Sequence, residues 1–386
     1  MEQNVITKHQ GQRIALVLQG GGALGAYQAG VYEALQEHDL TPDWVVGTSI
    51  GAINAAIIAG NHQPDRIARL RQFWESVSYR DLIDMRRVPD KTRQLNIRVS
   101  TLTSLLYGVP GLFRPRVSNV FASGMAVPAE MASFYDTSEL AQTLARLVDL
   151  ECLNGAGGVR LTVNALKVTT GELVSFDSRS HNMCIDHVMA SGALPPGFPP
   201  VRINGELYWD GGLFSNTPLE TVLEDEPRVD TLCFMVDLWS AAGPEPCTFD
   251  EVQTRTKDVT FASRSKFHID DYLHLHALRR TIRMMYESMP PALRTDDLLR
   301  ALEAVGADST MHIVRLAYAG RDWHMASKDI NFSRGSMEWR WQQGYQDAKR
   351  VLENAAWLRL VPAETGVVVH DMASPVIEAS DIPAPQ

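Results

Sequence analysis

Two short, wholly apolar segments near the start of the chain each end in a glycine turn that leads into a helical pattern. The first, 14–18 (IALVL), is closed by Gln19 and three glycines, and the second, 44–46, is closed by Gly47. A strand without polar alternation is typical of the interior of a parallel sheet. Because helical spacing of apolar residues follows each strand, this βαβα order predicts an α/β fold with a mostly parallel, helix-covered sheet.

The length and charge of the chain exclude several classes of protein. Its 386 residues exceed a usual single domain, so we expect one large α/β domain with an appendage. With 36 basic and 46 acidic residues the net charge is −10. We expect no nucleic-acid partner, because binding of that kind needs clustered basic charge. Apolar residues make up 45% of the chain, which is enough for a sizeable core.

The cysteines and the first residues indicate where the protein works. Four cysteines occur singly, so neither a disulfide framework nor a zinc site is predicted, and we expect no metal and no other cofactor. The N-terminal arm, 1–13, does not resemble a signal peptide, and no run of ~18 apolar residues could span a bilayer. We expect a cytoplasmic protein, or one that contacts a membrane surface peripherally from the cytoplasm.

Further strands are predicted in the main domain, which we assign to 14–240. They cover 161–168, 173–176 and 231–238, and the dipeptides Thr170-Gly171 and Asn204-Gly205 indicate hairpin turns. Residues 80–135 interrupt this pattern as an irregular insertion with little periodicity. Its part 80–120 holds eight basic and three acidic residues beside apolar side chains. A lid or membrane-facing surface and a plain solvated connection are both compatible with it.

The remainder of the chain is expected to be a mainly helical extension, 245–361. Five apolar residues recur at helical spacing in it and are expected to face the core, with a membrane-lying helix or a dimer seam as the alternative; they are Leu275, Leu278, Ile282, Met285 and Met289. A strand at 313–318 and a helix at 337–357 complete the extension. The tail, 362–386, is acidic and rich in proline, and we expect it to be disordered.

A glycine-rich loop, Gly20-Gly21-Gly22-Ala23-Leu24-Gly25, lies between the first predicted strand and helix. Consecutive glycines let backbone N–H groups converge on an anion at a helix N-terminus. The loop also matches the GxGxxG fingerprint of dinucleotide-binding proteins. That function needs an acidic residue at the end of the second strand, which here ends at Gly47. We therefore favour a loop that binds another anion.

A second motif, Gly47-Thr48-Ser49-Ile50-Gly51, is GxSxG between a strand and a helix. In that setting the serine lies on a tight elbow and is presented at the helix N-terminus as a nucleophile. The flanking glycines leave room for a turn that larger side chains would block. The alternative is that Ser49 only caps an ordinary helix.

The third motif is Asp210-Gly211-Gly212. An aspartate in a glycine turn is more often a local turn residue than a base. A carboxylate can nonetheless accept the proton of a serine if it is held within hydrogen-bond reach at a site that raises its pKa. Ser49 and Asp210 are far apart in the sequence, so only the fold can bring them together.

These motifs, in the order GGGALG, GTSIG, ASGALPPGFPPV (190–201) and DGG, resemble the patatin-like phospholipase family over roughly residues 14–240. After residue 245 the chain is similar to a helical extension of some bacterial members. The resemblance implies a three-layer, modified α/β hydrolase fold and lipid acyl hydrolysis by a Ser-Asp dyad without a catalytic histidine. By matching motif, Ser49 is the nucleophile, Asp210 is its base, and backbone N–H groups of Gly20 to Gly22 form the oxyanion hole.

One position departs from the family pattern, because many members have Arg or Lys where this chain has Leu24. Phospholipids therefore stand beside lysolipids, neutral esters and acyl thioesters as expected substrates. Acyl transfer by the same dyad and a non-catalytic, lipid-binding or regulatory module are the competing functions. Five histidines follow Asp210 in the order that a Ser-His-Asp triad would need, and we expect them to be surface or core residues; they are His268, His274, His276, His312 and His324.

Overall fold

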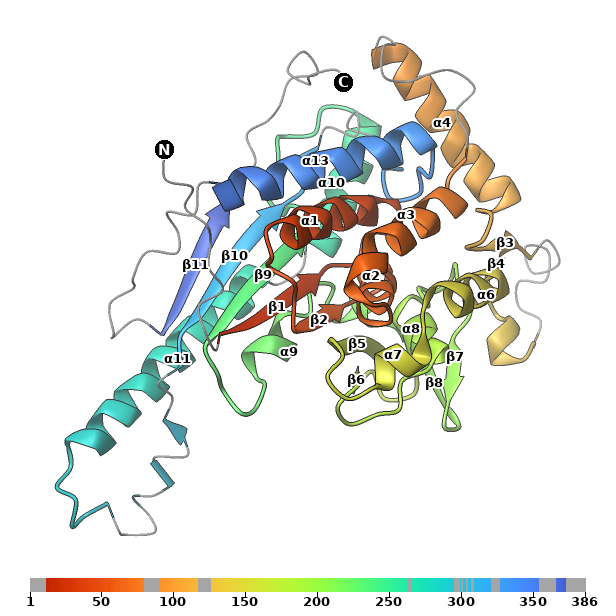
Figure 1. The fold of residues 1–386 in the computed structure, drawn as a ribbon. Helices are drawn as coiled ribbons and strands as arrows, with labels where there is room; N and C mark the ends of the chain where they lie inside the picture. Colours follow the sequence, from red (N-terminus) through yellow and green to blue (C-terminus); the bar gives the residue numbers. More distant parts are fainter. Residues whose placement is uncertain are drawn as a thin grey trace.

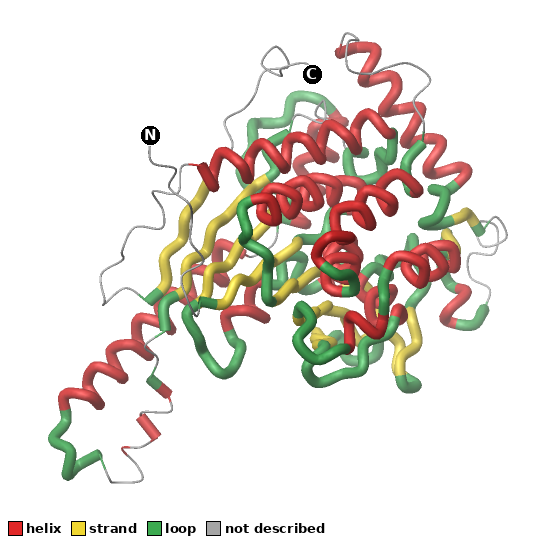
Figure 2. Tube along the Cα trace, viewed as in Figure 1, coloured by secondary structure: helices red, strands yellow, loops and turns green. Residues whose placement is uncertain are grey.

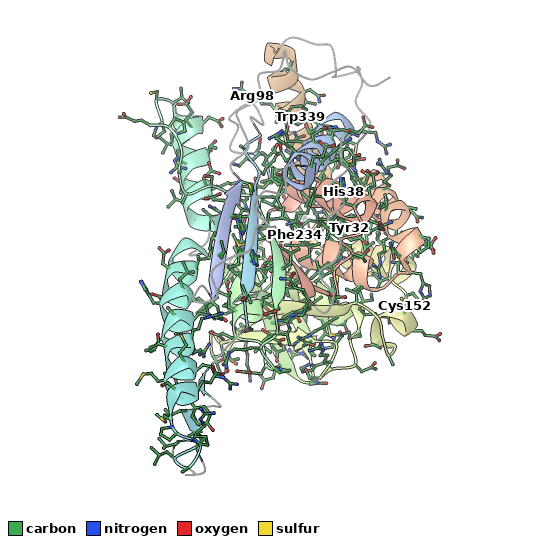
Figure 3. All side chains as sticks on the ribbon, turned by 60° about the vertical axis from the view of Figure 1, so that its left-hand side comes forward. Tyr32, His38, Arg98, Cys152, Phe234 and Trp339 are labelled. Atoms are coloured by element: carbon green, nitrogen blue, oxygen red, sulfur yellow. The ribbon has the colours of Figure 1, made fainter. Side chains whose placement is uncertain are left out.

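The computed structural model has a central sheet with helices on both faces (Figure 1, Figure 2). The residues that it describes are 12–79, 90–116, 126–262, 265–294, 299, 301–302, 305–306, 309–320, 327–353 and 366–372. Most of the predicted N-terminal arm, 1–13, therefore lies outside the described residues. Phe234 lies in the middle of the molecule, whereas Arg98 lies at its periphery (Figure 3).

Nine strands of the described chain form the central sheet in the order β11-β10-β9-β1-β2-β5-β8-β7, and β6 also pairs with β5. Pairing is parallel from β11 to β5, whereas β6, β7 and β8 pair antiparallel. The strands are β1 (Arg13–Leu18), β2 (Trp44–Gly47), β5 (Arg160–Lys167), β6 (Leu173–Asp177), β7 (Val201–Ile203), β8 (Glu206–Asp210), β9 (Thr231–Asp237), β10 (Met311–Ala317) and β11 (Val367–Met372). The predicted mostly parallel sheet is confirmed.

The helices of the described chain cover the two faces of this sheet, except for α4, which lies at the periphery (Figure 1). They are α1 (Ala26–Glu37), α2 (Ile50–Ala59), α3 (Arg66–Ser76), α4 (Asp90–Tyr107), α6 (Ser138–Leu147), α7 (Leu150–Asn154), α8 (Ile185–Ser191), α9 (Leu219–Leu223), α10 (Phe249–Phe261), α11 (Ser265–Ser288) and α13 (Arg334–Glu353). Alternate side chains of β1 enter different apolar cores: Leu16 packs with α1, α2 and α13, whereas Val17 packs with α9 and α11. The fold therefore has the expected three layers.

The C-terminal region is mainly helical, as predicted, and it also completes the sheet. Helix α13 lies along α1 (Figure 1), and two glycines allow their backbones to touch. A Cβ on Gly30 would lie 1.9 Å from the carbonyl oxygen of Trp341, and one on Gly344 would lie 2.0 Å from that of Tyr27. The hydroxyl of Tyr27 also donates a 3.0 Å hydrogen bond to Asp347. The sequence on the two sides of residue 245 thus shares one sheet and one core.

Two expectations about this region were wrong. Within the tail expected to be disordered, residues 367–372 form β11, because the run of three valines pairs in register with β10. Residues 362–365 and 373–386 of this tail lie outside the described residues. The apolar stripe expected to face the core is largely exposed at Leu275, Leu278 and Met285. Helix α11 instead buries a different side, with Ile269 and Tyr272, against the sheet.

The insertion 80–135 is also more regular than expected. It contains α4, a helix of 18 residues, and a short antiparallel pair of β3 (Arg114–Pro115) and β4 (Tyr135–Asp136). The helix was missed because its apolar spacing was not recognised. No helix in the described ranges is both long and apolar enough to cross a bilayer.

Candidate active site

Ser49 lies on a strained turn between the end of β2 and the start of α2. Its φ of 57° and ψ of −124° belong to a backbone conformation that residues with a side chain rarely adopt. The turn is held from the side, since the Ser49 N–H donates a 3.1 Å hydrogen bond to the carbonyl oxygen of Ser191, at the end of α8. Ser49 is half-buried in this turn. Such an elbow is typical of a serine nucleophile.

The two glycines of the motif are needed for close contacts around this elbow. A Cβ on Gly47 would lie 2.4 Å from the backbone of Gly51. A Cβ on Gly51 would lie 2.2 Å from the carbonyl oxygen of Leu18, at the end of β1. Helix α2 therefore begins directly against the ends of two strands, and any side chain at these positions would push the elbow away from the sheet.

Asp210 ends β8 and reaches the serine through the register of the sheet. Gly47 lies opposite Val163 of β5, and Asp210 lies opposite Ala165 of the same strand. The carboxylate is buried, with 2% of Asp210 exposed, and a side-chain hydrogen bond joins it to Ser49. The N–H of Gly212 donates a second hydrogen bond to Asp210 Oδ1 at 2.7 Å. The fold thus brings together the two residues that the sequence singled out.

Burial controls the protonation of Asp210. Removal of the carboxylate from water raises the pKa of Asp210 to about 7, and the hydrogen bonds from Gly212 and Ser49 only partly oppose this effect. A carboxyl with a pKa near neutrality can both accept and return a proton at working pH. This is the electrostatic behaviour expected of a general base.

The glycine-rich loop lies directly beside the serine. A Cβ on Gly20 would lie 3.1 Å from Cβ of Ser49. The N–H of Gly20 donates to the carbonyl oxygen of Asn216 at 3.0 Å, so this group is already engaged. In the described part of the chain, the N–H groups of Gly21 and Gly22 have no acceptor. Of the three predicted oxyanion donors, the loop therefore leaves Gly21 and Gly22 available for a ligand.

The last glycine of the loop and the two glycines of the DGG motif also make close contacts. A Cβ on Gly25 would lie 2.6 Å from a side-chain carbon of Ile50, which starts α2. A Cβ on Gly211 would lie 2.4 Å from the carbonyl oxygen of Asn164. A Cβ on Gly212 would lie 3.0 Å from Asp210 Oδ1. These glycines let the helix, the loop and the carboxylate meet at one point.

Buried polar side chains that we did not predict hold the glycine loop in place. The Asn216 side chain donates to the carbonyl oxygen of Gly20 at 3.1 Å, and the indole N–H of Trp239 donates to the same oxygen at 2.8 Å. Gln19 donates to Thr217 at 2.7 Å and accepts from the backbone N–H of Trp239 at 3.0 Å. The sequence signal for them was weak: Asn216 follows the DGG motif closely, and Gln19 precedes the first glycine.

The histidines beyond Asp210 have other neighbours where the structure describes them. His274 is exposed on α11, whereas His276 is buried against Tyr272 of the same helix. His312 stacks on His370 at the sheet edge, with 3.2 Å between ring nitrogens. The side chain of His268 and all of His324 lie outside the described residues. Among described side chains, no group of three or more His, Cys, Asp or Glu residues could hold a metal ion.

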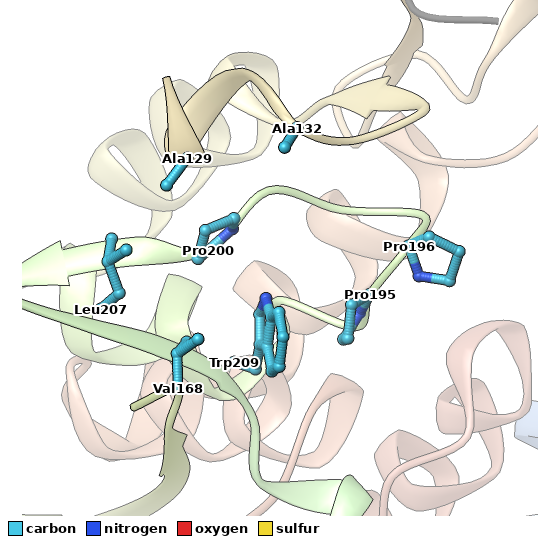
Figure 4. Close-up of a pocket in the computed structure, with 8 residues that line it drawn as sticks. All are labelled: Ala129, Ala132, Val168, Pro195, Pro196, Pro200, Leu207 and Trp209. Atoms are coloured by element: carbon cyan, nitrogen blue, oxygen red, sulfur yellow. The ribbon is translucent and has the colours of Figure 1, made fainter. Parts of the chain in front are cut away.

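An apolar pocket of about 450 Å³ lies close to this site but on the other side of β8 (Figure 4). Leu207 and Trp209 line it, and they alternate along the strand with Tyr208 and Asp210. Because successive side chains of a strand point to opposite faces, the pocket and the Asp210 carboxylate are separated by the strand itself. The pocket is therefore distinct from the centre around Ser49.

The comparison with known families agrees with this geometry. A family model described as patatin-like phospholipase matches residues 16–223, more than half of the chain, and a second, described as patatin phospholipase, matches residues 259–364. A mostly parallel sheet covered by helices, with a serine elbow, a buried aspartate and a glycine loop at the ends of its strands, is the architecture of the modified α/β hydrolase class. The chain belongs to the patatin-like phospholipase family.

Each of three similar proteins matches only part of the chain. Patatin-like phospholipase domain-containing protein 7 of Rattus norvegicus is 27% identical over 216 residues, which are 54% of this chain and 12% of that protein. Lysophospholipase NTE1 of Candida glabrata is 28% identical over 242 residues, 62% of this chain and 11% of that protein. Triacylglycerol lipase SDP1L of Arabidopsis thaliana is 33% identical over 75 residues, 19% of this chain and 9% of that protein.

The chain thus spans about a tenth of the length of these much larger relatives. Among solved structures, VipD of Legionella pneumophila aligns with 89% of this chain and 67% of its own, at 17% identity and a TM-score of 0.39. The names of the matched relatives, phospholipase, lysophospholipase and lipase, all denote lipid acyl hydrolysis, and this is the activity of the family.

Proposed function

We propose that this protein is a serine acyl hydrolase that cleaves lipid esters through a Ser49-Asp210 dyad. The observation that carries the proposal is the hydrogen bond between a serine on a strained elbow and a buried carboxylate whose pKa is raised to about 7. Serine is a weak nucleophile unless a neighbouring base takes its proton. Asp210 is the group in position to do so.

The reaction proceeds in two steps. Ser49 Oγ attacks the ester carbonyl carbon while its proton passes to Asp210, and the N–H groups of Gly21 and Gly22 stabilise the oxyanion. The carbon–oxygen bond to the alcohol breaks, the alcohol leaves with the proton from Asp210, and the acyl group remains on Ser49. Asp210 then takes a proton from water, which attacks the acyl-enzyme and releases the fatty acid. Loss of one oxyanion donor from such a site typically costs ~3 kcal/mol of transition-state stabilisation.

The substrate class is an acyl ester of a lipid: a phospholipid, a lysophospholipid or a neutral ester. Leu24, which replaces the basic residue of many family members, is fully buried and brings no charge to the glycine loop. We therefore propose lysolipids and neutral esters as substrates as well as phospholipids. A lipid substrate also leads us to propose a cytoplasmic protein that works at a membrane surface.

Labelling with a fluorophosphonate probe tests the dyad directly. We expect modification of Ser49, located by mass spectrometry of the labelled peptide, and its loss in Asp210→Asn. Release of free fatty acid from lysophosphatidylcholine or a neutral ester, measured beside Ser49→Ala, tests hydrolysis. Folded protein that neither labels nor hydrolyses any of these esters would contradict the proposal, and acyl transfer to an added alcohol would redirect it to a transferase.

A further inference from the structure

Helix α4 presents a stripe of large apolar residues to solvent and a side with small polar residues and one isoleucine to the protein. Four apolar residues occur at spacings of four, three and four, which places them on one narrow stripe. They are all more than half exposed: Leu95, Val99, Leu102 and Leu106. The opposite side of the helix is buried, and it carries one apolar residue, Ile97, beside Ser100 and Ser104. A surface helix normally turns its polar side to water and buries its large apolar residues, so the exposed stripe of α4 has the opposite arrangement.

The helix also packs only loosely against the rest of the molecule. It projects from the body of the molecule and runs along its periphery (Figure 1, Figure 3). The hydroxyl of Ser100 is buried and has no hydrogen-bond partner among the described residues. An exposed stripe of four large apolar residues on a projecting helix marks a contact surface rather than scattered exposure.

The charge around the stripe favours an anionic lipid surface over a second copy of the chain. Residues 90–116 contain five basic side chains and one acidic one, Asp90, although the whole chain has a net charge of −10. Arg98 is exposed on α4 (Figure 3), whereas Arg114 and Arg116 form ion pairs with Glu139 and Asp136. Two copies meeting through this stripe would bring like charges together. Apolar residues flanked by basic ones suit a helix that lies in the surface of an anionic bilayer.

A continuous set of contacts joins α4 to the candidate active site. The Tyr135 hydroxyl donates to the carbonyl oxygen of Leu105 on α4 at 3.1 Å, and the Tyr135 N–H donates to the carbonyl oxygen of Gly197 at 2.9 Å. The loop that contains Gly197 follows α8, whose last residue, Ser191, accepts the hydrogen bond from Ser49. In the same loop, Ala193 accepts a 3.0 Å hydrogen bond from the Asp210 N–H. The helix is therefore attached to the segment that positions both residues of the dyad.

We infer that α4 is a membrane-docking helix: its stripe of Leu95, Val99, Leu102 and Leu106 inserts into the surface of an anionic lipid bilayer and brings the enzyme to its lipid substrate. This inference rests on the proposed function for the identity of the substrate. Binding to a bilayer is nonetheless independent of catalysis and is measured separately.

Vesicle binding by full-length Ser49→Ala protein, which leaves the lipid unhydrolysed, tests the inference. The vesicles are phosphatidylcholine alone and phosphatidylcholine mixed with phosphatidylglycerol. The test variant adds Leu102→Ser and Leu106→Ser, at residues 56% and 59% exposed. The control adds Leu275→Ser and Leu278→Ser on α11, at residues 41% and 57% exposed, on a helix at the other end of the molecule (Figure 1).

We expect preferential binding to the anionic vesicles that weakens as salt rises, because exposed charges are screened over ~10 Å at 0.1 M. The α4 variant should lose about tenfold or more in partitioning, whereas the α11 control should bind as the parent does. With Ser49 restored, the α4 variant should hydrolyse a soluble ester, p-nitrophenyl butyrate, at the normal rate and vesicle lipid more slowly.

Equal partitioning of the α4 variant and the α11 control would overturn the inference. A concentration-dependent dimer that the α4 substitutions abolish, seen by sedimentation, would assign the stripe to a second copy and overturn it as well. If protein with Ser49 hydrolyses neither the soluble ester nor the vesicle lipid, the proposed function is wrong. The role of α4 in membrane binding is still tested by the vesicle-binding result alone.

Discussion

Arg340 and Ala23 are more than three hundred positions apart in the sequence, and a hydrogen bond of 3.0 Å joins Nη1 of the arginine to the carbonyl oxygen of the alanine. The guanidinium is completely buried and also donates to the carbonyl oxygens of Asn331, at 3.0 Å, and Lys328, at 2.7 Å. Ala23 belongs to the glycine-rich loop. A helix from the C-terminal region therefore positions the loop beside Ser49.

Arg340→Met should destabilise the protein and weaken catalysis. The substitution leaves three buried carbonyl oxygens without this donor, which should lower the free energy of unfolding by about 3 kcal/mol or more. Lysine cannot present donors in several directions, so Arg340→Lys should recover little. Urea unfolding and kcat/KM on a soluble ester check this. Arg334→Met, at a half-exposed residue of the same helix, is the control, and equal stability of the two variants would refute the role given to Arg340.

The pH dependence of activity should follow Asp210. As a base, Asp210 must be ionised, so kcat/KM should rise about tenfold per pH unit below pH 7 and level off above it. Ester hydrolysis measured between pH 5 and about 9 tests this. A profile that is flat from pH 5 to 8 would show that Asp210 is not the group whose ionisation controls the reaction.

Asp210→Asn should abolish activity and stabilise the fold at high pH. A carboxyl with a pKa of about 7 when folded and 3.8 when unfolded binds a proton more tightly in the fold, so its contribution to stability is lost as pH rises through this interval. Ionising it in the fold costs about 4 kcal/mol, and asparagine avoids this cost. Thermal unfolding should therefore show a stability gain at pH 8 that disappears near pH 4. A gain that does not change with pH would contradict the shifted pKa.

The strain at Ser49 should appear when two inactive variants are compared. Ser49→Gly and Ser49→Ala both remove the hydroxyl, but only glycine adopts the positive φ of 57° without steric cost. We expect Ser49→Gly to be more stable than Ser49→Ala by about 1 kcal/mol, after allowance for the greater freedom of glycine in the unfolded chain. Denaturant unfolding of both variants measures the difference, and a more stable alanine variant would argue against backbone strain.

Gly51→Ala sets helix propensity against packing. Within a helix, alanine is favoured over glycine by about 1 kcal/mol. At this position, however, its Cβ would lie 2.2 Å from the carbonyl oxygen of Leu18, so the clash should prevail with a net loss of about 2 kcal/mol and a large fall in kcat. Gly192→Ala is the matched control near the site, because its Cβ would meet nothing closer than 3.8 Å. The same unfolding and ester assays apply, and an active, stabilised Gly51→Ala protein would contradict the packing argument.

The sequence was sufficient where local pattern and structure coincide. The runs 14–18 and 44–46 are wholly buried strands, and their glycine turns hold the groups around Ser49 as expected. Contacts that only the tertiary fold creates could not be predicted from the sequence. Arg340, Asn216 and Gln19 have no local pattern that marks them, since their partners lie far away along the chain.

The wrong prediction for α11 has a physical cause. Apolar spacing was taken to mean burial, which holds only if the partner of an apolar face lies within the same chain. Helices α4 and α11 both show helical spacing of large apolar residues, and on both helices these residues are exposed. Spacing thus predicts which side of a helix is apolar, but not what covers that side.

The place of β1 in the sheet has a consequence for synthesis of the protein. β1 carries the chain to the glycine loop, and one of its two neighbouring strands, β9, is made more than two hundred residues later. The arginine that fixes the loop comes later still. While the nascent chain emerges from the ribosome, the serine is present long before the parts that organise it. The geometry around Ser49 can therefore form only once nearly all of this sequence has been synthesised.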